Sequence, residues 1–357
     1  MPDPTGQPTV LISSAGRRVE LLRTFRRTCD TFGGGDGAGS GVSGRVLAVD
    51  CSWFSSAFHD ADEAFLVPPC RDPAFVPRMI ELCATHGVDL VVPTIDPELP
   101  VYAAARHRFA AVNTAVAISS PEVVAIASDK QRTHEWLTAA GFPTVRQGTV
   151  DEVRADPGSW RFPVVVKPRF GSASVGVAVV RNPAELDHAT STAHGHQNTD
   201  PEDAYVVQSL ARGTEYTVDA LVTCEDSGSS GGSVVAAVPR RRIEVRAGEV
   251  AKAVTVRSPA LIELAEKLGA ALPGAFGPLN IQMFLDESSD EIAVIELNAR
   301  FGGGYPLTFA AGADFPRALL QQARGLPVTA ALSGWRDNLV MLRYDAAVFV
   351  DGAGAPP

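Results

Sequence analysis

Short apolar runs alternate along the chain with segments whose apolar residues recur at helical spacing. In the first third, the apolar runs at residues 10–14, 45–50 and 89–94 predict strands. Residues 19–28 carry apolar positions at helical spacing between the first two runs. Strands that alternate with helices are typical of α/β folds with a parallel sheet. We therefore expect a small doubly wound α/β domain at residues 1–118.

The later part of the chain is richer in strands and suggests an α+β arrangement. Residues 131–140 predict a helix that Ser128 or Asp129 caps. Gly141 would end that helix, and residues 258–272 predict a second, amphipathic helix. Further strands are predicted at residues 162–168, 176–180, 205–210, 214–222, 233–245, 279–285 and 291–297. A short loop would join strands 162–168 and 176–180. Strands 205–210 and 214–222 would be a further pair, and strands 279–285 and 291–297 would form a hairpin.

Composition and charge narrow the class of protein. The 357 residues include 31 basic and 41 acidic side chains, a net charge of −10, which argues against nucleic acid or an anionic membrane as the main partner. No apolar run approaches the ~20 residues of a membrane-spanning helix, and the first residues lack the basic start of a secretory signal. The five cysteines are scattered, without the paired spacing of a zinc site. We expect a cytoplasmic protein that acts on small molecules and binds neither nucleic acid nor membranes.

A glycine-rich segment at residues 33–44 contains the spacing GxGxxG between Gly39 and Gly44. The dinucleotide-binding fingerprint of this form follows a strand and opens a helix. Here the segment follows a predicted helix and precedes a predicted strand. We therefore interpret it as a flexible loop and not as a nucleotide site.

Lys167 lies at the end of the predicted strand 162–168, and a loop of small residues leads from there into the next strand. Glycine and serine in this loop, residues 171–176, let the backbone approach an anion closely and offer N–H and hydroxyl donors to phosphate oxygens. A P-loop is excluded because Val177 stands where that motif has lysine, and because a strand follows instead of a helix. Two interpretations stay open: a phosphate-binding loop, or an ordinary hairpin with a solvated lysine.

The predicted C-terminal hairpin carries a second candidate site. Because side chains alternate along a strand, Glu296, Asn298 and Arg300 share one face. Pairing about the turn places Gln282 opposite Glu296. Carboxylate and amide oxygens suit Mg²⁺, and a nearby arginine suits a phosphoryl group in transfer. The alternative is a solvent-facing polar edge, but the glycine run at residues 302–304 favours the site.

Taken in order, these segments resemble the motifs of the ATP-grasp superfamily, most closely its branch of carbamoyl-phosphate-synthetase-large-subunit-like proteins and carboxylate–amine ligases. The motifs are Ser128-Asp129-Lys130, VVVKPRFGSASVG, VVQSLARGTEYTVD, NIQMF and VIELNARFGGG. The resemblance implies an N-terminal pre-ATP-grasp domain at residues 1–118 and a two-subdomain ATP-grasp fold at residues 119–325, with a lid at about residues 145–207. A C-terminal strand and tail would occupy residues 326–357. It also implies that the protein uses ATP with Mg²⁺ or Mn²⁺.

The resemblance assigns roles by position. Lys130 and Lys167 would neutralise ATP phosphates, and Arg300 would stabilise the γ-phosphoryl group in transfer, so that Lys167 and Arg300 are the catalytic candidates. The residues implied to bind ATP are Lys130, Lys167, Arg169, Gly171, Ser172, Ser174, Gln208, Ser209, Leu210 and Glu215. The loop at 171–176 would close over the phosphates, residues 208–210 would hold adenine, and Glu215 would hold the ribose.

One or two metal ions would be held by Gln282, Glu296 and Asn298. At the position of Gln282 many relatives have a carboxylate, although the synthetase-like branch itself has glutamine, so a weaker second metal site is an open alternative. At the position of Gln208 many relatives have glutamate, which matters little if the adenine contact runs through the backbone.

Several arginines could hold a substrate carboxylate. Alternation along the predicted strand 233–245 puts Arg240 and Arg242 on one face, and with Gly303 they are the candidate substrate residues; a merely solvated basic strand is the alternative. Arg17 and Arg18 follow the first strand and could reach the same cleft, because ligands of open α/β sheets bind beyond the carboxyl ends of strands. For these two we favour the simpler explanation of surface arginines at a helix start.

These features predict an ATP-dependent ligase that phosphorylates a carboxylate to an acyl phosphate and couples it to an amine, with release of ADP and phosphate. Phosphorylation is needed because oxide is a hopeless leaving group for direct attack by an amine. Two alternatives stay open: phosphorylation of carbonate or a carbamate, and a non-catalytic ATP-binding sensor. The partners would be a small-molecule carboxylate and an amine, whose identity the sequence does not reveal, and a homodimer is an open form of assembly.

Overall fold

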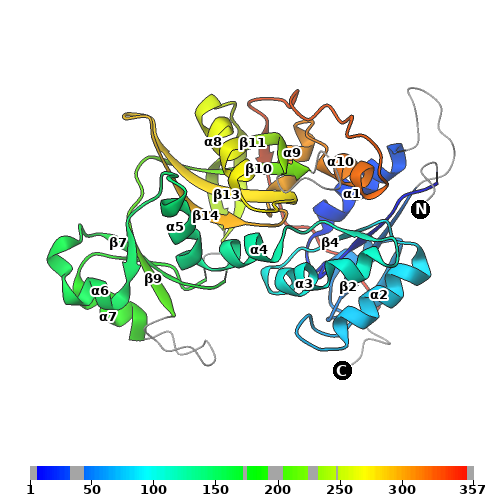
Figure 1. Ribbon diagram of the computed structural model, residues 1–357, viewed down its shortest axis with the longest axis horizontal. Helices are drawn as coiled ribbons and strands as arrows, with labels where there is room; N and C mark the ends of the chain where they lie inside the picture. The colour runs from blue at the N-terminus through cyan, green and yellow to red at the C-terminus, as the bar shows by residue number, and fades with distance from the viewer. Residues whose placement is uncertain are drawn as a thin grey trace.

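The computed structural model describes residues 6–32, 44–171, 175–191, 204–223, 232–246 and 248–351. Apart from Gly44, the GxGxxG segment lies outside these residues, and so do Ser172 and Ser174. In the described part the chain forms three β-sheets with helices packed on them (Figure 1). None of the described helices is both long and apolar enough to cross a bilayer.

The first sheet is parallel and has the strand order β3-β2-β1-β4-β5. Its strands are β1 (Thr9–Ile12), β2 (Arg45–Asp50), β3 (Glu63–Leu66), β4 (Leu90–Val92) and β5 (Ala115–Val116). The three strands expected from apolar runs are the central ones, because only these are buried on both faces. The edge strands were not expected, since β3 is largely exposed and β5 has two residues. The strand order confirms the predicted doubly wound arrangement.

Helices cover both faces of this sheet. They are α1 (Val19–Thr31), α2 (Phe75–His86) and α3 (Leu99–Ala110). Two short 3-10 helices also occur here: η1 (Ser56–His59) between β2 and β3, and η2 (Asp96–Glu98) between β4 and α3. Val10 and Ile12 of β1 pack towards α1, whereas Leu11 between them packs towards α2 and α3. Burying one large apolar side chain in this way contributes about 1.5–3 kcal/mol to stability.

The second sheet is antiparallel, with the order β14-β13-β10-β11-β12-β15. Its strands are β10 (Thr214–Thr223), β11 (Ser233–Arg246), β12 (Glu249–Thr255), β13 (Gly277–Asp286), β14 (Glu291–Asn298) and β15 (Val340–Leu342). Helices α4 (Pro121–Ser128), α5 (Lys130–Ala139) and α8 (Pro259–Ala271) pack on it. The two helices predicted in this part of the chain are α5 and α8. Asp129 caps α5 by accepting a hydrogen bond of 3.0 Å from the Gln131 amide.

The third sheet has the order β6-β9-β7-β8. Its strands are β6 (Gln147–Thr149), β7 (Val164–Pro168), β8 (Ala178–Val180) and β9 (Tyr205–Ser209), accompanied by α6 (Val150–Ala155), η3 (Pro157–Ser159) and α7 (Pro183–Ser191). The predicted strands 205–210 and 214–222 do not pair with each other: β9 joins this sheet, and β10 joins the six-stranded one. The chain crosses between the sheets at Gly213, whose φ is 85° and where a Cβ would lie 2.1 Å from the carbonyl oxygen of Leu285. Only glycine permits that approach.

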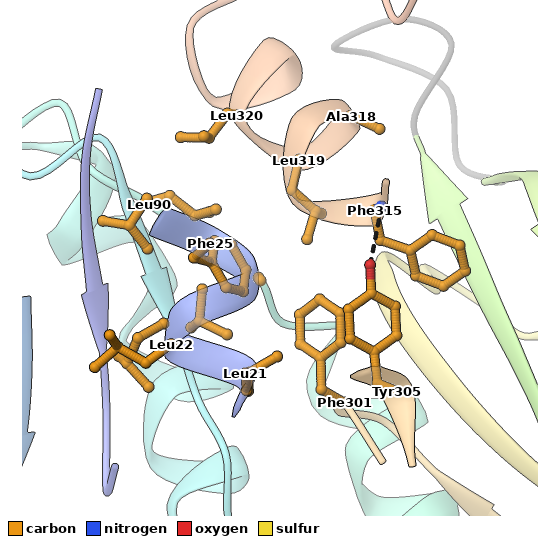
Figure 2. Close-up of a cluster of buried hydrophobic side chains, with 14 of the residues drawn as sticks. Leu21, Leu22, Phe25, Leu90, Phe301, Tyr305, Phe315, Ala318, Leu319 and Leu320 are labelled. Carbon is orange, nitrogen blue, oxygen red and sulfur yellow. Dashed lines mark hydrogen bonds between the residues drawn. The ribbon is translucent and has the colours of Figure 1, made fainter. Parts of the chain in front are cut away.

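The C-terminal helices α9 (Tyr305–Ala310) and α10 (Phe315–Ala323) return to the first sheet (Figure 2). Phe301 packs edge-to-face on Phe25 of α1, with ring centroids 5.7 Å apart. The Tyr305 hydroxyl accepts a hydrogen bond from the Phe315 amide at 3.0 Å and donates one to the Ala313 carbonyl at 3.1 Å. The segment that follows β14 is therefore anchored in the core of the N-terminal sheet.

Candidate functional site

Two adjoining cavities contain most of the predicted site residues. One has a volume of about 340 Å³ and the other of about 120 Å³, and both are lined by Arg242, Gly248, Gln282 and Glu296. The larger cavity also holds the predicted residues Lys130, Lys167, Gly171, Gln208, Ser209, Leu210 and Glu215. The smaller cavity also holds the predicted residues Arg240, Asn298, Arg300 and Gly303. The site therefore consists of two spaces that meet at Gln282 and Glu296.

Two buried lysines supply positive charge to the larger cavity. Lys167, at the end of β7, is 5% exposed, and its Nζ lies 3.5 Å from the carbonyl oxygen of Ile295. Lys130 begins α5, and its Nζ donates to the Gly171 carbonyl at 2.7 Å. Burial lowers the pKa of Lys167 to about 8; Glu296 and Glu215 oppose this shift, and Lys130 adds to it. An anionic ligand in this cavity would offset the free-energy cost of burying these two positive charges.

Arg169, which the resemblance implies to bind ATP, is paired with a carboxylate of the chain itself. Its guanidinium makes two hydrogen bonds of 2.8 Å to the carboxylate of Asp129, and it does not line the larger cavity. Asp129 is also the cap of α5. The pair thus ties the helix that begins at Lys130 to the strand that ends beside Lys167.

The crossing between the two sheets forms one wall of the larger cavity. The side chain of Gln208 is buried, and its Nε2 donates a hydrogen bond to Gln147 Oε1 at 2.7 Å. Glu215 lines the same cavity, and its carboxylate is ion-paired with Arg242 from β11.

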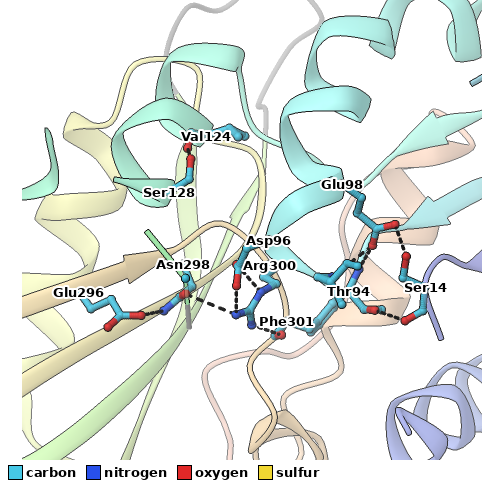
Figure 3. A network of polar contacts seen from close by, with 12 residues as sticks. Ser14, Thr94, Asp96, Glu98, Val124, Ser128, Glu296, Asn298, Arg300 and Phe301 are labelled. Carbon is cyan, nitrogen blue, oxygen red and sulfur yellow. Dashed lines mark hydrogen bonds and ion pairs between the residues drawn. The ribbon is translucent and has the colours of Figure 1, made fainter. Parts of the chain in front are cut away.

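The predicted pairing of the C-terminal hairpin is present. Gln282 of β13 lies opposite Glu296 of β14, and Asn280 lies opposite Asn298. Asn298 Nδ2 donates to Glu296 Oε1 at 3.3 Å, which places these side chains on one face (Figure 3). In the described part of the chain no three His, Cys, Asp or Glu side chains gather as metal ligands. One carboxylate with two amide oxygens fits Mg²⁺ that shares phosphate oxygens, and it does not fit Zn²⁺.

Arg300 lies on the same face, but its guanidinium is held by a residue that sequence reasoning missed. Asp96 of η2 accepts hydrogen bonds of 2.6 and 2.8 Å from Arg300 Nε and Nη2 (Figure 3). Burial alone would lower the pKa of Arg300, but the carboxylate of Asp96, with those of Glu296 and Glu98, outweighs it and raises the pKa above its usual value. The N-terminal sheet therefore contributes a group to the predicted catalytic arginine.

The loop that carries Asp96 is fixed by a fully buried carboxylate, Glu98. Ser13 and Ser14 donate their hydroxyls to one of its oxygens at 2.6 and 2.7 Å. The Thr94 and Ile95 amides donate to the other oxygen at 2.6 and 3.2 Å (Figure 3). Burial raises the pKa of Glu98 in spite of these donors. The carboxyl ends of β1 and β4 are thereby bound together, which is the position at which doubly wound sheets bind ligands.

Arg240, a predicted substrate residue, is buried and already paired with a carboxylate. It is 1% exposed, and its Nε and Nη2 donate to Asp219 at 2.7 and 2.9 Å. Asn280 and Thr308 donate to the same carboxylate at 2.7 and 2.5 Å. Of the three guanidinium nitrogens of Arg240, only Nη1 has no hydrogen-bond partner among the described residues, and a Cβ on Gly304 would lie 2.1 Å from it. Arg240 thus lines the smaller cavity with a guanidinium that is already paired. The glycine run lets the backbone lie against this guanidinium.

The two adjacent N-terminal arginines, for which we favoured a surface position, differ in their exposure to solvent. The Arg17 side chain is 89% exposed and lies 3.8 Å from Glu249. Arg18 is half-buried, lines the smaller cavity, and donates to the Thr94 carbonyl oxygen at 3.4 Å. The surface interpretation therefore holds for Arg17 and is wrong for Arg18, which reaches the cleft.

A third hollow, of about 700 Å³, lies outside this site. It is wide open and runs between residues 210–212, α8 and the end of the β13–β14 hairpin. Of the predicted site residues it includes only Leu210. Its one lysine, Lys267, is paired with Glu263 at 2.7 Å. Its size alone gives no reason to place a nucleotide there.

The lowered pKa of Lys167 leads to a pH-dependent prediction. Below pH 8 the ammonium is charged and attracts phosphate, and above pH 8 it becomes neutral. The affinity for Mg·ADP should therefore fall by about tenfold between pH 7 and pH 9. In Lys167→Arg, which keeps its charge, the dependence should be much flatter. Isothermal titration calorimetry across this range tests it, with Lys267→Arg on the surface of α8 as the control; a flat wild-type profile would refute it.

Comparison with known proteins places the two parts of the chain in known families. A model described as the PylC-like N-terminal domain matches residues 10–117, and one described as an ATP-grasp domain matches residues 127–304. The formate-dependent phosphoribosylglycinamide formyltransferase of Bifidobacterium longum is 26% identical over 269 residues, 69% of this chain and 66% of that protein. The D-alanine–D-alanine ligase of Deinococcus radiodurans is 38% identical over 80 residues, 20% of this chain and 24% of the ligase. The chain thus spans about half to two thirds of the length of the two formyltransferases that it matches, that of B. longum and its counterpart in Bifidobacterium adolescentis.

Solved structures share the fold. Biotin carboxylase from Campylobacter jejuni superposes with a TM-score of 0.70 at 17% identity, covering 94% of this chain and 75% of its own. The L-amino acid ligase from Bacillus licheniformis superposes with a TM-score of 0.63 at 18% identity, covering 89% and 74%. At these identities the likeness establishes the fold alone.

Proposed function

Since this chain belongs to the ATP-grasp superfamily and has a PylC-like N-terminal domain, we propose that it is an ATP-dependent carboxylate–amine ligase. It would phosphorylate a carboxylate to an acyl phosphate, couple the acyl group to an amine, and release ADP and phosphate. The observation that carries the proposal is the junction of two cavities at Gln282 and Glu296. One cavity offers two buried lysines for a polyphosphate, and the other offers arginines for an acid.

The first step needs charge neutralisation and alignment more than a protein nucleophile. A carboxylate oxygen attacks the γ-phosphorus, and the bond from that phosphorus to the β-phosphate oxygen breaks. Lys130 and Lys167 would counter the charge of the phosphates, and Arg300 would stabilise the group in transfer. The backbone at residues 208–210 would hold adenine, and Glu215 would hold the ribose.

In the second step the amine nitrogen attacks the acyl carbon. Phosphate leaves with the oxygen that came from the carboxylate, and the amine gives up a proton. Gln282, Glu296 and Asn298 would hold the metal ion, which supplies Lewis-acid neutralisation of phosphate charge when bound. The carboxylate and the amine are small molecules in this proposal, and the homodimer and the cytoplasmic location stay predictions.

A screen for ADP release tests this function directly. Purified protein with Mg·ATP is offered small acids and amines, alone and in pairs, with bicarbonate as a separate arm. We expect ADP only when an acid is present, and full turnover only with an acid and an amine together. With ¹⁸O in the carboxylate, one label should appear in the released phosphate. AMP in place of ADP would show adenylation, and a strict need for bicarbonate would show a carboxylase; either result overturns the proposal.

A further inference from the structure

Arg18 is a half-buried cation that has no role in the two proposed reaction steps. It directly precedes α1, and a Cβ built on Gly303 would lie 3.3 Å from its Nη1, so the guanidinium lies against the glycine run. Its hydrogen bond to the Thr94 carbonyl is long, at 3.4 Å. Burial lowers the pKa of Arg18 and the nearby Arg300 lowers it further, whereas the carboxylates of Glu249 and Asp96 raise it without offsetting the burial. These surroundings leave a charged guanidinium partly withdrawn from water.

The neighbouring arginines each hold a carboxylate, whereas Arg18 forms no ion pair with any described residue. The pairs are Arg240–Asp219, Arg242–Glu215, Arg300–Asp96 and Arg343–Glu249. A guanidinium withdrawn from water without a counter-ion is unfavourable, and a ligand carboxylate with bidentate geometry removes that penalty. Among these arginines only Arg18 has no carboxylate of the described residues within ion-pair distance, and Glu249 and Asp96 act on it from farther away.

The position of Arg18 separates it from the phosphoryl transfer. Transfer takes place where the cavities meet, at Gln282 and Glu296, and Arg18 lines only the smaller cavity. Gly303 and Glu249 line the same cavity, and Arg343 from the C-terminal segment donates hydrogen bonds to both. A volume of about 120 Å³ holds roughly four water-sized groups. A short carbon chain that ends in a carboxylate fits this space.

We propose that Arg18 binds an anionic group of a substrate, distinct from the carboxylate that is phosphorylated. The inference rests on the proposed ligase function and gives the class of its substrate: a short molecule with a carboxylate at the end remote from the reacting group. That carboxylate belongs either to the acid, which is then a dicarboxylic acid, or to the amine, which is then an amino acid. Arg18 and Arg343 lie outside the matched ATP-grasp domain of residues 127–304. Substrate choice is thus made by segments that the domain itself does not include.

Calorimetric binding to protein saturated with Mg·ADP tests the inference without turnover. The probes are succinate, glutarate and adipate with their monoamides, and glycine, alanine, glutamate and lysine with their α-carboxamides. The proteins are the wild type, Arg18→Gln and Arg17→Gln. Arg17→Gln is a matched control, because it removes the same charge from the adjacent, exposed residue.

In the wild type and in Arg17→Gln, at least one acid should bind about tenfold or more tightly than its amide. Arg18→Gln should lose this preference and keep its affinity for Mg·ADP within twofold. A preference among the diacids assigns the group to the acid, and a preference among the amino acids assigns it to the amine. The inference is overturned if amides bind the wild type as well as acids do, if no probe binds, or if the preference survives in Arg18→Gln. Failure of the wild type to bind Mg·ADP would instead remove the proposed function, and this inference with it.

Discussion

Glu296→Gln is expected to lower the turnover number by a factor on the order of 10²–10³ or more, because it removes the one carboxylate among the described residues that lines both cavities. Glutamine has the same shape and can still accept the hydrogen bond from Asn298. The loss would therefore come from the charge that holds the metal ion and that faces Lys167. Steady-state ADP release measures it, and the melting temperature should change little, because glutamine keeps the shape of the side chain and this hydrogen bond.

The control is Glu291→Gln at the exposed start of the same strand. It removes the same charge from β14 at a distance from the cavities, and turnover should stay at the wild-type level. If Glu296→Gln retains turnover within about threefold of wild type, too small a change for a lost metal ligand, the assignment of Glu296 to the metal site is wrong.

The sequence predicted those parts of the fold that depend on local burial. Strands β1, β2 and β4 are buried on both faces and appear as apolar runs, whereas β3 carries exposed residues and β5 is too short to produce a pattern. The separation of β9 from β10 could not be predicted, because an apolar run shows that a segment is a strand and not which strand it pairs with. Only Gly213, between the two, marked a change of direction.

In the candidate site, too, local patterns could be predicted from the sequence and contacts between distant residues could not. The alternation of β14 and the short turn before it fixed the pairing of Gln282 with Glu296. Asp96 was missed because it acts on a residue 204 positions away, and no local pattern links the two. The burial of Arg240 likewise depends on Asp219 from another strand. For Arg18 a signal existed, since it follows the carboxyl end of β1, but a surface arginine at a helix start has the same sequence.

The pair of Arg300 and Asp96 raises the question of whether the arginine serves catalysis or only holds two parts of the protein together. Arg300 is 8% exposed and joins β14 to η2 of the N-terminal part. Removal of either partner leaves the other charge buried, which typically destabilises a protein by about 3–5 kcal/mol. A loss of activity in one variant alone would therefore be ambiguous.

A double-mutant cycle separates the two roles. Arg300→Ala should lower turnover by about 10³–10⁵, as expected for an arginine that stabilises a phosphoryl group in transfer. Asp96→Asn, which keeps Arg300 in place but orients it less firmly, should lower turnover by only about 10–100-fold. The double variant Arg300→Ala/Asp96→Asn should be no slower than Arg300→Ala, because Asp96 acts through Arg300. It should also recover part of the stability lost in Arg300→Ala, which urea unfolding measures. If the double variant recovers turnover together with stability, Arg300 is a structural link and not a catalytic residue.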